Sequence, residues 1–267
     1  MPTPTSAPRP VHFGALLGLG FVTDFLDTLG VGSFATTSTA LKLGSMVEDD
    51  EIPGTLNVGH ALPTFLIGMI FITVIEVETI TLVSMIVASL IGAWFGAGIV
   101  SSLPKRKIQI GLAAALLVTA LFILLRQLEI FPPGGDALQL TGILLLIGVI
   151  VNGGIGALTT LGIGNYAPCM ALVSLLGMNP TAAFPIMMGS AALILPVASI
   201  RFIKSGRFNK RTALGLMLGG IPGVLIAAFI VKSLPLAAVN WLVVFVLLYT
   251  SVLMWRSAQA EAASSAA

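Results

Sequence analysis

Long apolar runs alternate along this chain with short clusters of proline, glycine and charged residues. Several runs reach about 20 residues, the length that an α-helix needs to cross about 30 Å of hydrocarbon. A run such as residues 143–151 shows no alternation of apolar and polar positions, so the pattern does not indicate a membrane β-barrel. The pattern predicts a series of membrane-spanning helices.

The clusters divide the runs into ten helical segments, five in each half of the chain. In the first half we expect them at residues 11–29, 33–45, 54–75, 79–101 and 107–127. In the second half we expect them at residues 138–160, 166–178, 181–200, 211–232 and 236–255. The second segment of each half is too short to span a bilayer by itself. Each of these two is therefore expected to form a hairpin with the segment before it, joined at a Gly-x-Gly break.

The Gly-x-Gly break of the first half returns in the second half about 132 residues later. The two copies read Leu29-Gly30-Val31-Gly32-Ser33-Phe34 and Leu161-Gly162-Ile163-Gly164-Asn165-Tyr166. A duplicated, glycine-broken membrane unit is typical of transporters in which the breaks meet near the bilayer midplane. The expected protein is all-α and polytopic, with transmembrane repeats over residues 11–128 and 138–256. Residues 1–10 and 257–267 are expected to be disordered ends.

The basic residues indicate how the chain is oriented. Eleven of the thirteen Lys and Arg residues fall on one predicted side of the membrane, and Arg126 and Lys232 fall on the other. The positive-inside rule then predicts cytoplasmic termini in a cell inner membrane. Because each half has an odd number of segments, the second repeat must be inverted relative to the first. The basic loop Lys105-Arg106-Lys107 accordingly corresponds to the uncharged Leu236-Ala237-Ala238.

Composition narrows the class of protein. The chain is 57% apolar and 9% charged, with a mean hydropathy of +1.05, which excludes a soluble globular domain. A net charge of +2 gives no reason to expect nucleic-acid binding. The single cysteine, Cys169, excludes an intrachain disulfide and is expected to be a buried apolar thiol. The expected partners are the lipid bilayer, a small substrate and a second copy in a homodimer.

Two carboxylates lie inside the first apolar segment. Asp24 and Asp27 share a helix face at a spacing of i and i+3. Because an intramembrane carboxylate is costly, it marks an ion or proton pathway, and we assign both residues to a coupling ion. The alternative is that Asp27 lies in water or that both residues cap backbone amides. Their equivalents in the second half are about Gly156 and Thr159, so only one half carries the acids.

The glycine breaks predict an anion site. A short helix that starts at such a break exposes backbone N–H groups and the positive end of its dipole. The predicted substrate-binding residues are Gly32, Ser33, Phe34, Thr36, Thr37, Asn57, His60, Gly164, Asn165 and Tyr166. The alternative for the glycines is that they only permit close helix packing. The alternative for His60 is a bond to a neighbouring carbonyl rather than a role with the anion or a proton.

Charged residues near the first short segment read as surface features. Lys42 is expected to anchor that segment at the membrane surface and to pair with the acidic stretch from Glu48 to Glu51. The run Asp49-Asp50-Glu51 is expected to be a solvated loop.

At the glycine breaks the sequence resembles the TauE/SafE family of sulfite and sulfonate exporters, also called the toluene-sulfonate uptake permease family. The resemblance extends over about residues 11–256 and is clearest at Gly30-Val31-Gly32 and Gly162-Ile163-Gly164. Family members usually carry three glycines where this chain has Gly32-Ser33-Phe34 and Gly164-Asn165-Tyr166. The resemblance implies transport of small organic or sulfur-containing anions, such as sulfite, sulfonates or related carboxylates, and names a class rather than a compound.

Residues and resemblance together predict a secondary active transporter coupled to H⁺ or Na⁺, with no other cofactor. Two ionised carboxylates would repel an anion, and a proton or Na⁺ would remove that repulsion. One alternative is a divalent-cation carrier with Asp24, Asp27, Asn57 and His60 as ligands. An enzyme is not expected, because the sequence has no clustered metal-ligand motif, no nucleophile–base pair and no phosphate-binding loop.

Overall fold

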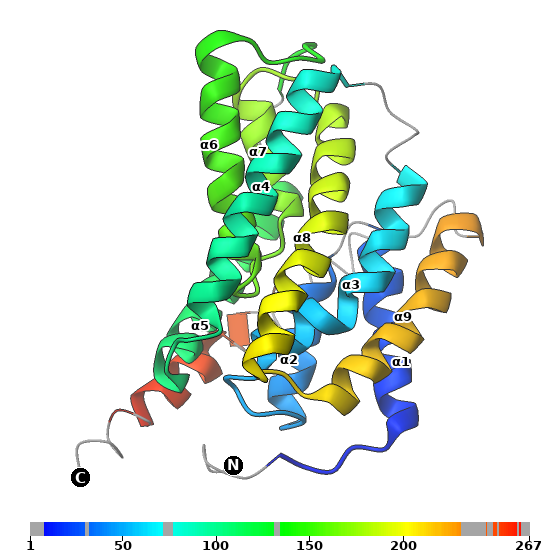
Figure 1. Cartoon of the computed structure of the whole chain (residues 1–267), viewed down its shortest axis with the longest axis vertical. Helices are drawn as coiled ribbons and strands as arrows, with labels where there is room; N and C mark the ends of the chain where they lie inside the picture. Colours follow the sequence, from blue (N-terminus) through cyan, green and yellow to red (C-terminus); the bar gives the residue numbers. More distant parts are fainter. Residues whose placement is uncertain are drawn as a thin grey trace.

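The computed structural model describes residues 8–29, 32–71, 77–130, 134–230, 244, 248–249, 251–260 and 262. Within these residues the regular structure is helical, apart from an isolated bridge between Ala137 and Met178. The helices in chain order are α1 (Phe13–Thr28), α2 (Ser33–Leu43), α3 (Ile52–Phe71), α4 (Thr79–Val100), α5 (Lys105–Gln127), α6 (Gly142–Thr159), α7 (Tyr166–Leu175), the 3₁₀ turn η1 (Pro180–Ala182), α8 (Ala183–Ser205) and α9 (Lys210–Ile230). Figure 1 shows them as one elongated bundle.

The expected segments agree with these helices. Each of the first nine predicted segments contains one long or short helix, with ends that differ by a few residues. The largest difference is at α8, which continues to Ser205 where the prediction ended at residue 200. Most of the tenth predicted segment, residues 236–255, lies outside the described residues. Residues 251–260 are helical, so at residues 257–260 the structure differs from the predicted disordered tail.

Five described helices are long and apolar enough to span a membrane, namely α4, α5, α6, α8 and α9. The protein is therefore a helical membrane protein. Two shorter helices, α2 and α7, start where the glycine breaks predicted. α2 begins at Ser33, directly after Gly32 with a φ of 92°, and α7 begins at Tyr166, shortly after Gly162 with a φ of 122°. A positive φ suits glycine, which explains why the chain turns there.

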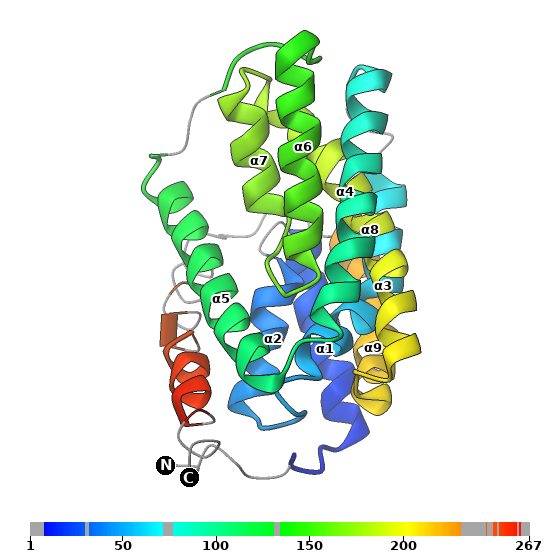
Figure 2. The same cartoon turned by 60° about the vertical axis from the view of Figure 1, so that its left-hand side comes forward.

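The helices of the two halves interleave. α1 packs along α9 on one flank of the bundle, and α4 packs along α6 on the other, as Figures 1 and 2 show. α3 and α8 pack against each other between these flanks. α3 also contacts α9, and α8 also contacts α4. The first half therefore finds most of its partners in the second half.

Glycines allow the flanking pairs to approach closely. A Cβ atom at Gly92 of α4 would overlap the carbonyl oxygen of Gly153 in α6, and one at Gly156 would overlap Ser89. On the other flank, a Cβ at Gly219 of α9 would overlap the carbonyl oxygen of Leu17 in α1. In lipid, helices associate through such close backbone contacts, because apolar side chains gain nothing by leaving the hydrocarbon.

The outer surface is apolar while polar groups lie inside. α4 and α6 direct large apolar side chains outward, including Ile80, Phe95, Ile99, Ile143 and Ile150. An exposed apolar surface of this kind is suited to contact with lipid chains. Buried side chains include carboxylates, a histidine, asparagines and several hydroxyls. This distribution concentrates the candidate chemistry in the interior.

The loop between α2 and α3 is held by ion pairs. Lys42 contacts the carboxylate of Asp49 at 2.6 Å and donates to the hydroxyl of Ser257 at 2.9 Å, so the expected pairing of Lys42 is confirmed. The prediction of a solvated loop is wrong for Asp49, which is only 8% exposed. Its carboxylate is satisfied in the interior because Gln109 of α5 donates to it as well, at 2.8 Å.

The neighbouring acids of this loop reach other helices. Glu48 pairs with Lys105 at 2.6 Å, and Asp50 lies 3.5 Å from Arg207. The loop therefore connects α2 with α5 and with the turn between α8 and α9.

Two glycines of α6 provide a matched test of the close helix packing. Gly156→Ala is expected to destabilise the protein by about 1–3 kcal/mol, because the new methyl group overlaps the backbone of Ser89. Gly154→Ala is the control, since a Cβ there meets nothing within 4 Å. Thermal unfolding in detergent would measure both variants. Equal melting temperatures would contradict this account of the contact between α4 and α6.

Candidate functional site

Three buried side chains from three helices form a hydrogen-bonded network. His60 Nδ1 of α3 lies 2.9 Å and 3.0 Å from the two carboxylate oxygens of Asp24 in α1. His60 Nε2 lies 3.0 Å from the hydroxyl oxygen of Thr37 in α2. All three residues are 0% exposed. The network joins α1, α2 and α3 at one point.

A glycine of α9 makes room for this network. A Cβ atom at Gly220 would overlap Oδ2 of Asp24 and the ring of Pro63. Because α9 carries no side chain there, the carboxylate fits between α1, α3 and α9. Sequence reasoning did not identify Gly220, since nothing local connects it with an acid almost 200 residues earlier.

The network meets the electrostatic requirement of a buried carboxylate. An unpaired charge in a low-dielectric interior costs several kcal/mol, so buried charges have partners. When Asp24 and His60 together hold one extra proton, the pair is neutral overall, whichever group carries it. Both ring nitrogens of His60 have partners, so the ring is fixed in orientation.

Asp27 has a different partner from Asp24. Its Oδ1 accepts a hydrogen bond of 3.0 Å from the backbone N–H of Ser33, the first residue of α2. Asp27 is 4% exposed. It therefore caps the start of the next helix, which is one of the two alternatives that the sequence left open for it. The two carboxylates of α1 therefore have different roles, because Asp24 pairs with His60 and Asp27 caps the start of α2.

A pocket of about 160 Å³ lies beside Asp27. Its lining includes residues from both glycine breaks, namely Gly32, Ser33, Phe34, Gly164, Asn165 and Tyr166. These two segments are about 130 residues apart in sequence. The fold therefore brings the starts of α2 and α7 to one cavity.

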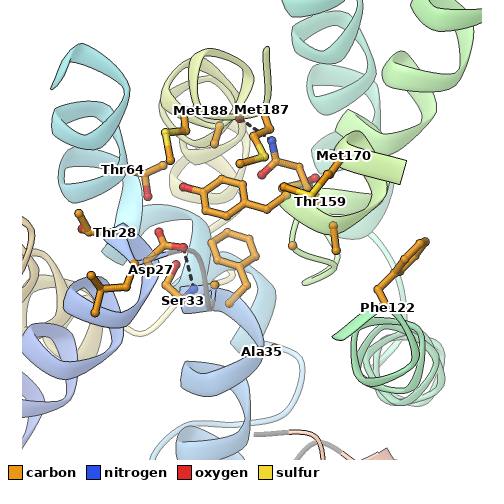
Figure 3. Close-up of a pocket in the computed structure, with 18 of the residues that line it drawn as sticks. Asp27, Thr28, Ser33, Ala35, Thr64, Phe122, Thr159, Met170, Met187 and Met188 are labelled. Atoms are coloured by element: carbon orange, nitrogen blue, oxygen red, sulfur yellow. Dashed lines mark hydrogen bonds between the residues drawn. The ribbon is translucent and has the colours of Figure 1, made fainter. Parts of the chain in front are cut away.

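The pocket has a polar end and an apolar end. In Figure 3, Asp27, Ser33 and Thr64 lie on one side, and Phe122 lies across the cavity from them. Met170, Met187 and Met188 add thioether groups to the wall. Among the described residues that line the pocket there is no Lys, Arg or His. Any anion held here would be bound by hydrogen-bond donors rather than by a cationic side chain.

Two hydroxyl groups in the pocket have no hydrogen-bond partner among the described residues. They are Oγ1 of Thr64 in α3 and the phenol oxygen of Tyr166 at the start of α7, and both atoms are buried. A buried polar group without a partner costs about 1–3 kcal/mol. Both groups therefore remain available to a ligand. Tyr166 was among the predicted site residues, whereas sequence reasoning missed Thr64, which looks like an ordinary polar residue next to Pro63.

Four other predicted substrate residues lie outside the pocket lining. The Thr36 hydroxyl donates to carbonyl oxygens at the start of its own helix. Asn57 donates to the carbonyl oxygens of Pro53 and Thr160. Thr37 and His60 belong to the buried network with Asp24. The structure thus places six of the predicted residues at the pocket and two in the buried network, while Thr36 and Asn57 bond to backbone carbonyl oxygens.

The second half of the chain matches a known protein family. Residues 144–267 match the family model described as Sulfite exporter TauE/SafE. No curated protein and no solved structure matches the chain. The resemblance to TauE/SafE seen in the sequence is therefore confirmed over this part. The matched family is one of membrane transporters of the sulfite or sulfonate type.

The TauE/SafE match includes one wall of the pocket. α7, with Asn165 before it, falls within the matched residues. The side-chain amide of Asn165 donates to the carbonyl oxygen of Met187 in α8 at 2.8 Å. This bond fixes the second glycine break against the long helix that follows it.

The divalent-cation alternative gains no support from this geometry. Within the described ranges, no group of three or more His, Cys, Asp or Glu side chains is arranged to hold a metal ion. The side-chain nitrogen of Asn57 and both ring nitrogens of His60 already have protein partners.

The pairing of Asp24 with His60 can be tested by a double-mutant cycle. Asp24→Ala and His60→Ala are each expected to lower stability by about 3–5 kcal/mol, because each leaves a buried partner unpaired. The double variant should lose less than the sum, with a coupling energy of about 0.5–3 kcal/mol. Unfolding in detergent would measure the cycle, and additive effects would show that the two groups do not interact.

Proposed function

We propose that this protein is a secondary transporter of a small organic or sulfur-containing anion, and that the pocket between α2 and α7 is its substrate site. The observation that carries the proposal is that two helix starts open onto the same cavity. Helix starts present free N–H groups and the positive end of the dipole, which suit sulfite, a sulfonate or a carboxylate. The similarity to TauE/SafE supports the same class of substrate.

The packing of the helices supports two inverted repeats. In an inverted repeat, α1 would correspond to α6, α3 to α8, and α4 to α9. The packed pair α1–α9 would then correspond to the packed pair α6–α4. In the same way α3–α9 corresponds to α8–α4, and all four pairs are packed along each other. α3 and α8 correspond to each other and are in contact, as a two-fold axis between them requires. Such repeats suit a substrate site at the interface of the two halves.

The buried network supports coupling to H⁺ or Na⁺ through Asp24. Asp24 does not line the pocket, but it lies on the same helix as Asp27, which does. Its bond to His60 gives α1 a protonatable partner on α3. We therefore assign His60 to the coupling network, together with Asp24, rather than to direct contact with the substrate.

The membrane orientation follows from the charge pattern. The ion-paired loop between α2 and α3, with Lys105 and Arg207, belongs to the predicted cytoplasmic side. We infer that the chain lies in the inner membrane with this cluster facing the cytoplasm.

The pocket can be tested by binding of a short sulfonate. Thr64→Val is expected to weaken binding of ethanesulfonate to the purified protein about three- to tenfold, since a hydroxyl that would bond the ligand is lost. Thr36→Val is the matched control, because that hydroxyl bonds its own helix and lies outside the lining. Isothermal titration would compare the two variants. Equal affinities would place the ligand elsewhere, and stabilisation by divalent metals alone would favour a cation carrier.

Coupling can be tested separately from binding. In proteoliposomes, Asp24→Asn is expected to abolish ethanesulfonate accumulation driven by a proton or Na⁺ gradient. It should retain counterflow exchange, which requires binding and translocation but no driving ion. Asp50→Asn is the control, because that carboxylate lies in the ion-paired loop outside the network. Gradient-driven accumulation at the wild-type level in Asp24→Asn would contradict the assigned role.

A further inference from the structure

The carboxylate of Asp27 occupies the position at α2 where an anion would bind. Its Oδ1 accepts the N–H of Ser33 at 3.0 Å, and Figure 3 shows this bond at the edge of the pocket. Ser33 is the first residue of α2, and Gly32 before it supplies no side-chain cap. The first N–H groups of a helix have no partner within the helix, and anions bind there for that reason. The protein therefore places a carboxyl group of its own at this site.

An independent feature of the same end of the pocket points to a ligand. Thr64 is only 3% exposed, and its hydroxyl has no partner among the described residues. In Figure 3 this hydroxyl is directed into the cavity, toward the end that holds Asp27 and Ser33. A ligand that reached Ser33 would also meet this unused donor.

The start of α7 opens onto the same pocket but has no acidic cap. The residue before it, Asn165, directs its side chain to the carbonyl oxygen of Met187 and makes no capping bond. Thr159, at the position equivalent to Asp27, donates to the carbonyl oxygen of Ile155 in its own helix. Of the two helix starts at the pocket, the one at α2 is occupied by a carboxylate of the chain and the one at α7 is not.

We propose that Asp27 is a built-in competitor of the substrate, holding the α2 amide that the anionic group of the substrate takes when it binds. This inference rests on the proposed function. A carboxylate and a sulfonate accept the same hydrogen bond, and two anions cannot share one N–H donor without strong repulsion. Binding therefore requires that the Asp27 carboxylate leave Ser33 or lose its charge.

The groups around Asp27 determine how readily its charge is lost. The titratable side chains that face it, in the part of the chain that the structure describes, are Asp24 on its own helix, His60 on α3 and Tyr166 on α7. Asp24 is itself paired with His60. A proton or Na⁺ that neutralises Asp27 weakens its bond to the N–H of Ser33, so that a ligand can displace it, and removes a like charge from the pocket at the same time. Competition at one amide would thus link substrate binding to the coupling ion.

Comparison of the wild type with two variants at Asp27 separates the effect of its charge from the effect of its hydrogen bond to the N–H of Ser33. Asp27→Asn removes the charge but keeps an oxygen that can accept from Ser33. Asp27→Ala removes both and leaves the amide free. We expect Asp27→Ala to bind ethanesulfonate about tenfold more tightly than the wild type, with Asp27→Asn between them. Isothermal titration of the full-length protein in detergent would measure the three affinities.

Substitutions at Ser33 show whether the gain depends on this amide. In the Asp27→Ala background, Ser33→Pro removes the N–H at the first position of a helix, where proline is tolerated. Ser33→Ala keeps the N–H and removes only the hydroxyl. We expect the alanine variant to bind ethanesulfonate more tightly than the proline variant, provided that circular dichroism shows both to be folded.

The outcomes are distinct. If Asp27→Ala binds no more tightly than Asp27→Asn, or if Ser33→Pro and Ser33→Ala are equal, competition for the amide is wrong. Should Asp27→Ala not fold, an affinity of Asp27→Asn no higher than that of the wild type would overturn the inference. If ethanesulfonate, sulfite and acetate bind to neither the wild type nor any variant, the proposed function itself fails.

Discussion

Burial of the Asp24 carboxylate constrains the arrangement of the helices around it. A carboxylate in an apolar interior needs a partner close by, and His60 supplies it at 2.9 Å. That bond fixes α1 against α3, and the bond from His60 to Thr37 adds α2. α9 can close over the group only because residue 220 is glycine. Four helices therefore meet at a single buried pair, and the pocket lies beside it, next to Asp27 on the same helix.

The donors in the pocket are backbone amides and hydroxyls rather than cationic side chains. Amides at a helix start and the hydroxyls of Thr64 and Tyr166 are directional, but each carries only a partial charge. A lysine or arginine at this position would hold an anion more strongly. A carrier must also release its substrate on the far side of the membrane, and weaker donors are compatible with release. Under the proposed function, these donors would hold an anion weakly enough to release it.

The sequence predicts local features such as the starts of helices, but it does not predict which side chains of different helices contact each other. The starts of α2 and α7 follow directly from glycines that permit a positive φ, so both were predicted. The bond between Asp24 and His60 joins residues 36 positions apart, and nothing in either segment specifies the other. Asp49 was expected in solvent because acidic runs usually are, but it is buried, with its charge compensated by Lys42 and a further hydrogen bond from Gln109. The bond between Asp24 and His60 and the burial of Asp49 both depend on how the helices pack, which the hydrophobic pattern does not encode.

The interleaved packing has a consequence for how the protein is made. α1 emerges during synthesis well before its main partner, α9, which begins at Lys210. Through most of translation α1 must remain in the bilayer without the glycine-rich face on which it finally packs. Asp24 reaches the membrane before His60 does, so α1 carries an unpaired acid until α3 follows. The packing of α1 is therefore completed only after α9 has been synthesised.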